Sequence, residues 1–376
     1  MPAFSILLYL HMKRLFAVLL AGLVTTGMAA QNMVYTEASD LTIVGKLMPG
    51  MTSNVYHRVD TVRYKGFNEV ENLQVRETSG MSCAFRTNSR TISIQTVYGE
   101  VGWPYNTNGI SARGYNLYIK KDGRWLFAGT AAPERNQLDK AITIAGHMDG
   151  SEHECLLYFP LYSEEYSIKI GVEQGSTLEA LENPFRHRIA IWGSSYTHGS
   201  STSRSGMTYP AIFSRRTGLQ MLSLGCSGNC RLQDYFCDVL CDVEADAFVF
   251  DCFSNPNART IRAKLQPFID RMIAAHPGKP MIFQQTIYRE NRLFDTKLER
   301  TESEKMHAAD SIMRAIKSTP EGRKKYKDVY FIHPDCSTKD HEGQVDGTHP
   351  GNYGYSLWEA SIEKKIVRIL RRYGIR

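Results

Sequence analysis

The sequence predicts an α/β fold in which a β-sandwich domain precedes a three-layer α/β/α domain. Up to about residue 175 the chain shows short runs of alternating apolar and polar residues, a pattern typical of antiparallel sandwiches. From about residue 186 apolar strands alternate with helical patterns, which indicates a mostly parallel sheet covered on both faces. The hydrophobic share of 42% and the charged share of 22% are those of a soluble globular protein.

Residues 1–30 form a distinct amino-terminal segment. Lys13 and Arg14 precede an apolar run at 15–24, and small residues follow it up to Ala30. This order is typical of a signal peptide, because the apolar run is too short to span a bilayer comfortably. Met12 is an alternative start, and an uncleaved anchor is the alternative interpretation. We expect cleavage near Ala30, export to the periplasm or beyond, and no stable membrane insertion afterwards.

Residues 31–175 are expected to form the β-sandwich domain. Lys-Lys-Asp-Gly at 120–123 separates two of its alternating runs and indicates a hairpin. The runs lie at 72–76, 91–97, 115–119, 125–128, 154–159 and 167–172. Residues 173–185 contain Gly-Ser and Asn-Pro pairs and are expected to link the two domains.

Residues 186–376 are expected to form the α/β/α domain. Its strands are predicted at 188–193, 219–225, 247–253, 280–285 and 328–333, and its helices at 208–217, 231–242, 257–276, 300–318 and 351–373. Open α/β folds bind their ligands at the carboxyl ends of the strands. Polar residues that follow these strands are therefore the candidates for a functional site.

Two motifs at opposite ends of this domain suggest serine-based ester chemistry. An apolar strand ends in Gly-Ser-Ser at 193–195, and Asp-Gly-Thr-His at 346–349 can supply a base and its orienting carboxylate from one turn. A serine hydroxyl is a poor nucleophile until a base takes its proton. We interpret Ser195 as the nucleophile, His349 as the general base and Asp346 as the residue that orients it.

Two residues close to the proposed nucleophile are rivals for these roles. Ser194 is an alternative nucleophile because it belongs to the same motif. His198 lies three residues after Ser195 and is an alternative base, although a short loop would have to turn its ring back onto the serine.

Two further segments complete a resemblance to a known family. Residues 224–229 read Leu-Gly-Cys-Ser-Gly-Asn, and residues 248–256 read Phe-Val-Phe-Asp-Cys-Phe-Ser-Asn-Pro. With the two motifs above, the order of blocks over residues 186–375 resembles the SGNH (GDSL-type) hydrolases, whose blocks supply a serine, a glycine, an asparagine and an Asp-x-x-His. The resemblance implies a flavodoxin-like sheet and a serine esterase that needs no cofactor and no metal.

The resemblance also implies an oxyanion hole, made of the N–H groups of Ser195 and Gly228 and the side-chain amide of Asn255. Such donors stabilise the negative charge that develops on the carbonyl oxygen. The chain departs from the family at two points: it has Ser194 where Asp is usual, and Ser-Asn-Pro-Asn replaces Gly-x-Asn-Asp. The second departure makes Asn257 a competitor of Asn255.

The first half carries a weaker resemblance of the same kind. Gly-Tyr-Asn-Leu-Tyr at 114–118 and Phe-Pro-Leu-Tyr-Ser at 159–163 resemble the Gly-x-Asp-Leu-Tyr and Leu-Pro-Leu-Tyr stretches of a small domain that precedes some bacterial SGNH esterases. The implied first domain is a jelly-roll-like sandwich.

Eight cysteines raise the question of a disulfide or a metal site. Four of them follow the spacing Cys226-x3-Cys230-x6-Cys237-x3-Cys241, which lacks the paired C-x2-C knuckles of a structural zinc site. Burial as small apolar residues, a disulfide within the cluster and a metal site all stay open, with burial the preferred interpretation.

The resemblance implies a carbohydrate esterase that removes acetyl or similar small acyl groups, so the expected partner is a small acyl ester or an acylated glycan. The alternatives are a lysophospholipase or thioesterase with the same triad, or a non-catalytic glycan-binding protein on this scaffold. The formal charge of +6 falls to +4 without Lys13 and Arg14, which argues against a nucleic-acid partner. The oligomeric state is open. Aromatic residues that could stack on sugars are Trp103, Tyr105, Tyr196, Tyr209 and Tyr288.

Overall fold

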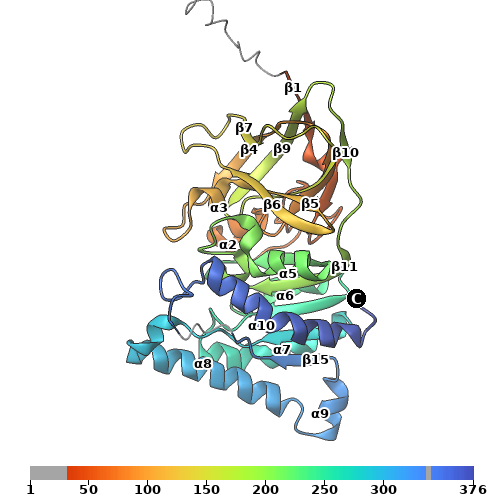
Figure 1. The fold of residues 1–376 in the computed structure, drawn as a ribbon. Coiled ribbons are helices and arrows are strands. Elements are labelled where there is room, and N and C mark those ends of the chain that lie inside the picture. Colours follow the sequence, from red (N-terminus) through yellow and green to blue (C-terminus); the bar gives the residue numbers. More distant parts are fainter. Residues whose placement is uncertain (1–31, 336–339) are drawn as a thin grey trace, which may run out of the picture.

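The computed structural model describes residues 32–335 and 340–376, so the expected signal peptide 1–30 and Cys336 lie outside the described residues. Two antiparallel sheets make up most of the first half of the chain, and one parallel sheet with helices makes up the second half (Figure 1). The predicted fold class is confirmed. No helix within the described ranges is long and apolar enough to cross a membrane.

The two antiparallel sheets of the first half pack face to face. Their strand orders are β1-β9-β4-β7 and β10-β3-β8-β5-β6, and β2 pairs with β3. The strands are β1 Met33–Glu37, β2 Thr42–Val44, β3 Ser82–Thr87, β4 Ile92–Val101, β5 Tyr115–Lys121, β6 Arg124–Ala131, β7 Ile142–Ala145, β8 His153–Tyr158, β9 Ser163–Glu173 and β10 Leu178–Ala180. Side chains from both sheets, such as Phe85 of β3 and Ile170 of β9, share one buried core. The structure therefore has the sandwich that the alternating runs predicted.

The hairpin expected at 120–123 is present between β5 and β6. Asp122 and Gly123 both have positive φ, 51° and 74°, which is the requirement of a two-residue type I′ turn. The short elements outside the sheets in this half are η1 Ala38–Asp40, α2 Glu69–Arg76 and α3 Gly109–Arg113.

Two local predictions in this half are wrong. The run at 72–76 is not a strand but the end of helix α2, whose start is fixed by a capping box: Asn68 accepts from the N–H of Glu71, and the Glu71 carboxylate accepts from the N–H of Asn68. The expected linker 173–185 contains β10, which pairs antiparallel with β3. Pairing of that short segment depends on β3, about 90 residues away, and not on its own pattern.

The parallel sheet of the second half has the strand order β12-β11-β13-β14-β15. Its strands are β11 Arg186–Gly193, β12 Leu219–Gly225, β13 Ala247–Asp251, β14 Met281–Gln284 and β15 Val329–Ile332. The chain leaves β11 toward β12 on one side and then crosses to β13 on the other. This order is the flavodoxin-like one, and its topological switch point lies at the carboxyl end of β11.

Helices cover both faces of this sheet (Figure 1). They are α4 Ser195–His198, η2 Ser205–Met207, α5 Tyr209–Thr217, α6 Asp234–Cys241, α7 Ala258–Ala275, η3 Glu290–Leu293, α8 Thr296–Ala315, α9 Pro320–Lys325 and α10 Asn352–Arg371. Ile189 and Ile191 of β11 pack with α5 and α10, whereas Ala190 and Trp192 pack with α6, α7 and α8. Alternate residues of β11 thus contribute side chains to two separate cores, one on each face of the sheet, as a three-layer domain requires.

The two halves share an extensive buried contact. Val59 and Val75 from the first half belong to the same buried core as α6 and α7. Arg58 is fully buried, and its guanidinium donates to the carbonyl oxygens of Ser223 and Gly225 over 3.3 and 3.1 Å. The first half therefore holds the carboxyl end of β12, which leads into Gly228.

Candidate active site

The predicted nucleophile lies at the switch point of the sheet. Ser195 is the first residue of α4, directly after β11, and its side-chain Oγ lies 2.9 Å from Nε2 of His349. The strand can end this way only because residue 193 is glycine: a Cβ there would come within 2.0 Å of Thr197 Oγ1 and 2.9 Å of Asp251 Oδ2. A sharp turn at Gly193 therefore aims the Ser195 hydroxyl at the imidazole.

Ser194, the rival nucleophile, is engaged elsewhere. Its Oγ donates to Asp251 Oδ2 over 3.1 Å and accepts from the N–H of Tyr196 over 3.3 Å, so it caps the start of α4. Its side chain makes no hydrogen bond to His349 among the described residues. The geometry therefore favours Ser195 over Ser194.

The Asp346–His349 turn presents the imidazole to Ser195. Nδ1 of His349 lies 2.8 Å from Asp346 Oδ2, while Asp346 Oδ1 accepts the N–H groups of Thr348 and His349 over 3.0 and 2.7 Å. Gly347 has a φ of +74°, a conformation that glycine adopts without strain. With a proton on Nδ1 bound to Asp346, the lone pair of Nε2 faces the serine hydroxyl.

The environment of Asp346 keeps its carboxyl group ionised. Burial raises the pKa of Asp346, but hydrogen bonds from the Asn106 amide and from the backbone and ring of His349 outweigh burial and hold the pKa below its usual range. An ionised carboxylate can hold the Nδ1–H tautomer and stabilise the imidazolium formed in catalysis.

The three predicted oxyanion donors follow three neighbouring strands, β11, β12 and β13. In the part of the chain that the structure describes, the N–H groups of Ser195 and Gly228 donate to no protein acceptor. Asn255 uses its Oδ1 to accept the N–H of Cys230 over 3.2 Å, which leaves its NH2 group without a protein partner among the same residues. All three donors are therefore available at this edge of the sheet.

Asn257, the competitor of Asn255, has another role. It is exposed and is the N-cap of α7, where its Oδ1 accepts the N–H of Thr260 over 2.8 Å. A side chain held in this cap is not directed at a substrate beside Ser195. The geometry thus favours Asn255 for the oxyanion hole.

His198, the rival base, is a buried structural residue. Its Nε2 lies 2.6 Å from the carbonyl oxygen of Leu161 and 3.1 Å from Glu77 Oε2. Its Nδ1 accepts from the N–H and Oγ of Ser227, and its ring stacks on Tyr162 at a centroid distance of 4.1 Å. The imidazole therefore ties the loop after β12 to the first half of the chain and is not free to act on Ser195.

The sequence did not predict the contacts that three residues make around the proposed triad, and it pointed to one of them, Tyr105, only as a sugar-stacking candidate. Asn106 Nδ2 lies 3.0 Å from Asp346 Oδ2, and the hydroxyl of Tyr105 donates to the same oxygen over 3.1 Å. No local signal marks these residues, because about 240 positions separate them from Asp346. The third is Asp251, whose place at the end of an apolar strand was a usable signal.

Asp251 is a fully buried carboxyl group beside the turn that carries Ser195. It accepts from Ser194 Oγ and from Thr197 Oγ1, at 3.1 and 3.0 Å. Burial raises the pKa of Asp251 to about 7, although these hydrogen bonds lower it. It supports the turn that carries Ser195 and makes no hydrogen bond or ion pair with His349 among the described residues.

The aromatic candidates for sugar binding fall into two groups. Tyr196 and Tyr209 are buried in the core with Trp358, so neither ring is exposed for stacking on a sugar. Trp103 and Tyr105 are exposed, at 40% and 90%. The second pair lies on the loop that reaches the triad.

Three of the four clustered cysteines are buried, as the preferred interpretation expects. Cys226, Cys230 and Cys237 lie in the hydrophobic core, and the seven described cysteines are free. The sulfur atoms of Cys237 and Cys241 lie 4.0 Å apart, about twice the length of a disulfide bond. Between residues 32 and 335 and from 340 onward, no three His, Cys, Asp or Glu side chains are grouped to hold a metal ion.

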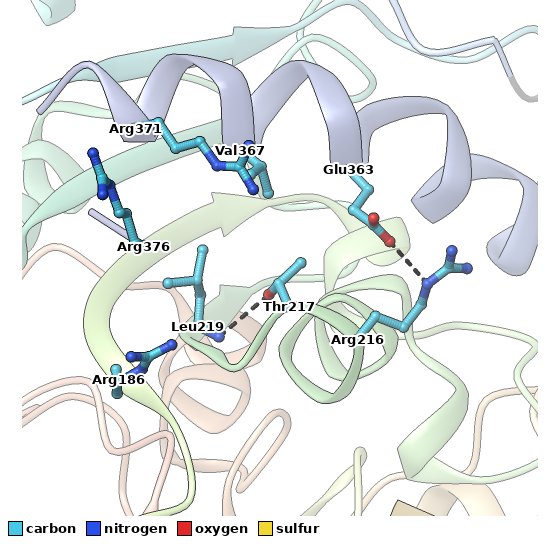
Figure 2. A pocket seen from close by; sticks show the side chains of 8 residues that line it. All are labelled: Arg186, Arg216, Thr217, Leu219, Glu363, Val367, Arg371 and Arg376. Atoms are coloured by element: carbon cyan, nitrogen blue, oxygen red, sulfur yellow. Dashed lines mark hydrogen bonds and ion pairs between the residues drawn. The ribbon is translucent and has the colours of Figure 1, made fainter. Parts of the chain in front are cut away.

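A cavity of about 630 Å³ lies away from this site. Figure 2 shows its lining, which includes the ion pair of Arg216 with Glu363 at 2.8 Å. The lining residues are Arg186, Arg216, Thr217, Leu219, Glu363, Val367, Arg371 and Arg376. Because β11 begins at Arg186 and β12 at Leu219, the cavity marks the amino edge of the sheet, opposite Ser195.

Comparisons with known proteins agree with the family resemblance of the sequence motifs. Residues 186–367 match the GDSL-like lipase/acylhydrolase family, and residues 33–178 match the GxDLY family, the amino-terminal part of SGNH hydrolase-type esterases. No curated protein matches the sequence.

Several solved structures share the fold. A GDSL-like lipase from Bacteroides ovatus is 34% identical with a TM-score of 0.85, covering 90% of this chain and 98% of its own. A salicylyl-acyltransferase from a tetracycline biosynthetic pathway is 17% identical (TM-score 0.68; coverage 92% and 100%). A family two carbohydrate esterase from Cellvibrio japonicus is 11% identical (TM-score 0.57; coverage 90% and 98%). The last two likenesses concern the fold alone.

Proposed function

The chain belongs to the SGNH (GDSL-type) hydrolases, which cleave ester bonds, and we propose that it is an exported esterase that removes small acyl groups, acetyl above all, from carbohydrates. In this proposal Ser195, His349 and Asp346 are the catalytic triad. The observation that carries it is the continuous path from Ser195 Oγ to His349 Nε2 at 2.9 Å and from His349 Nδ1 to Asp346 Oδ2 at 2.8 Å.

The proposed reaction follows from this path. Ser195 Oγ attacks the ester carbonyl carbon while its proton passes to His349 Nε2. The negative charge on the carbonyl oxygen is stabilised by the N–H groups of Ser195 and Gly228 and by the NH2 group of Asn255. When the bond to the alcohol breaks, the departing oxygen takes the proton from His349, and the acyl group stays on Ser195.

A water molecule completes the proposed cycle. The oxygen of the water attacks the acyl-enzyme carbonyl carbon while His349 takes a proton from the water. The same three donors stabilise the second oxyanion. Collapse returns the proton to Ser195 Oγ and releases the carboxylic acid.

The features of this chain best support a carbohydrate as the alcohol component of the ester substrate. Trp103 and Tyr105 expose aromatic rings, and Tyr105 contacts Asp346 directly. Exposed aromatic rings offer apolar faces to ligands, and carbohydrate esterases share the fold across 90% of the chain. Export is supported by the pattern of residues 1–30, and a mature protein starting near Gln31 in the exported fraction is the expected result by mass spectrometry.

The central test compares the two serines of the strand-end turn. Ser195→Ala should lower kcat on an aryl acetate by several orders of magnitude. Ser194→Ala should keep most of the activity and lose about 1 kcal/mol of stability, because it removes a helix cap. The reverse outcome would mean that Ser194 is the nucleophile.

The substrate test uses acyl chain length and the nature of the alcohol. Aryl acetate, butyrate and octanoate should be hydrolysed in falling order, and acetate should be released from acetylated polysaccharides. A preference for octanoate would favour the lysophospholipase or thioesterase alternative. Failure of a fluorophosphonate probe to label Ser195 would favour a non-catalytic glycan-binding protein.

A further inference from the structure

Loop 102–108, which joins β4 to α3 in the first half of the chain, reaches the triad in the second half. The amide nitrogen of Asn106 lies 3.0 Å from Asp346 Oδ2 and 3.1 Å from His349 Nδ1. Together with Tyr105, it places two side chains of the amino-terminal half on the acid–base pair.

The chemistry of the partners fixes the orientation of the Asn106 amide. A carboxylate only accepts hydrogen bonds, so the NH2 group of Asn106 must face Asp346. Its Oδ1 then points to the other side, where Thr107 Oγ1 lies 3.4 Å away. Because His349 also donates to Asp346 Oδ2 through Nδ1, the amide and the imidazole hold the same oxygen from two directions.

The loop itself is anchored on the carboxy-terminal half. The hydroxyl of Thr107 accepts the N–H of Ser201 over 3.2 Å. The side chain of Asn108 caps α3 through Oδ1 and donates from Nδ2 to the carbonyl oxygen of Ser203 over 3.1 Å. Asn106 is therefore held before any substrate binds, and its hydrogen bond to Asp346 needs little reordering.

Asp346 is the point on which these contacts converge. Oδ1 accepts two backbone N–H groups, and Oδ2 accepts from His349, Asn106 and Tyr105. The hydrogen bond from Asn106 is also among the contacts that lower the pKa of Asp346 against the effect of burial. A carboxylate with its lone pairs occupied in this way has one position from which to orient the imidazole.

We propose that Asn106 is a positioning residue of the esterase, which acts through Asp346 to hold His349 in line with Ser195. The inference rests on the proposed triad. It makes the amino-terminal half a part of the catalytic apparatus, because neither half alone supplies both Asn106 and Asp346.

The experiment measures kcat and KM on ethyl acetate for single variants of the full chain. Asn106→Ala should lower kcat by roughly 10- to 30-fold, as for the loss of a hydrogen bond to a charged group, and should leave KM within about 2-fold, because Asn106 does not bind substrate. The downfield proton resonance of His349 Nδ1–H should weaken in this variant. Asn88→Ala, which removes a side-chain hydrogen bond to the N–H of Thr177 that no residue of loop 102–108 or of the proposed triad shares, should keep kcat within about 3-fold.

A second substitution separates electrostatic positioning from simple packing. Asn106→Asp keeps the shape of the side chain but sets a carboxylate against Asp346, and like charges in contact repel. Positioning therefore predicts a larger loss of kcat in Asn106→Asp than in Asn106→Ala. A packing role predicts the opposite order, and that order would overturn the inference.

Ser195→Ala separates failure of the inference from failure of the proposed function. If Ser195→Ala is inactive and Asn106→Ala has the kcat of the wild type, the triad stands and the role of Asn106 is rejected. If Ser195→Ala keeps its activity, the triad itself is rejected, and the role of Asn106 with it.

Discussion

Replacing Asn255 should separate catalysis from stability at the proposed oxyanion hole. Asn255→Ala removes an NH2 donor that has no protein partner within the described residues, and such a donor contributes roughly 3 kcal/mol to the transition state, about 10²-fold in kcat. It also removes the acceptor of the Cys230 N–H, held at 3.2 Å, which costs about 1 kcal/mol of stability. Asn255→Asp keeps that acceptor and loses the donor, so its kcat should fall at least as far while its Tm stays near that of the wild type.

Asn257→Ala is the matched control. It deletes the N-cap of α7, where Oδ1 accepts the N–H of Thr260 over 2.8 Å, so it should cost about 1 kcal/mol and lower Tm by roughly 2 °C while kcat stays near wild type. The assay is kcat on one small ester, with Tm from circular dichroism for each variant. A greater loss of kcat at Asn257 than at Asn255 would refute the assignment, and wild-type rates in both would show that the loop after β13 does not line the site.

Three further changes have expected outcomes. Burial raises the folded-state pKa of Asp251 to about 7 from 3.8, so ionisation of this carboxyl group destabilises the fold increasingly from about pH 4 to pH 7. Asp251→Asn should therefore show a smaller fall in Tm between pH 5 and pH 8 than the wild type. An equal fall in both proteins would contradict the burial of Asp251 as an acid. Tyr105→Ala should raise KM for an acetylated oligosaccharide about 5-fold, the equivalent of a stacking contact of roughly 1 kcal/mol, and should leave KM for ethyl acetate unchanged. An equal rise in KM for both esters would argue against a sugar contact. Gly193→Ala would place a Cβ 2.0 Å from Thr197 Oγ1 and should cost about 1–3 kcal/mol by overpacking, so an unchanged Tm would contradict the close approach at the end of β11.

Helix α2 is a case in which the local pattern of apolar residues predicted the wrong secondary structure. Residues 72–76 alternate polar and apolar side chains as a strand does, yet Val75 and Gln74 are buried at the contact between the two halves. The Asn68-x-x-Glu71 capping box was the sequence signal for a helix. Tertiary burial of one helical face outweighed the short-range alternation.

The sequence by itself determined the strand and helix order of the second half and the chain positions of the candidate site. The local periodicity of apolar residues predicts buried strands and amphipathic helices. The carboxyl ends of parallel strands meet at one edge wherever the sheet forms. The predicted strands around β11, β12 and β13 therefore brought Ser195, Gly228 and Asn255 to the same side of the domain.

Only the tertiary structure decided between residues of the same chemical type. It assigned His198 to the contact with Glu77 and Asn257 to a helix cap, and it brought Asn106 to Asp346 across 240 positions of sequence. A side chain's orientation depends on which partners the whole fold places beside it, and hydrogen bonds are lost over distances of less than 1 Å. The proposed assignments of His349 as the base and of Asn106 as the residue that holds its carboxylate partner therefore depend on the packing of the two halves together.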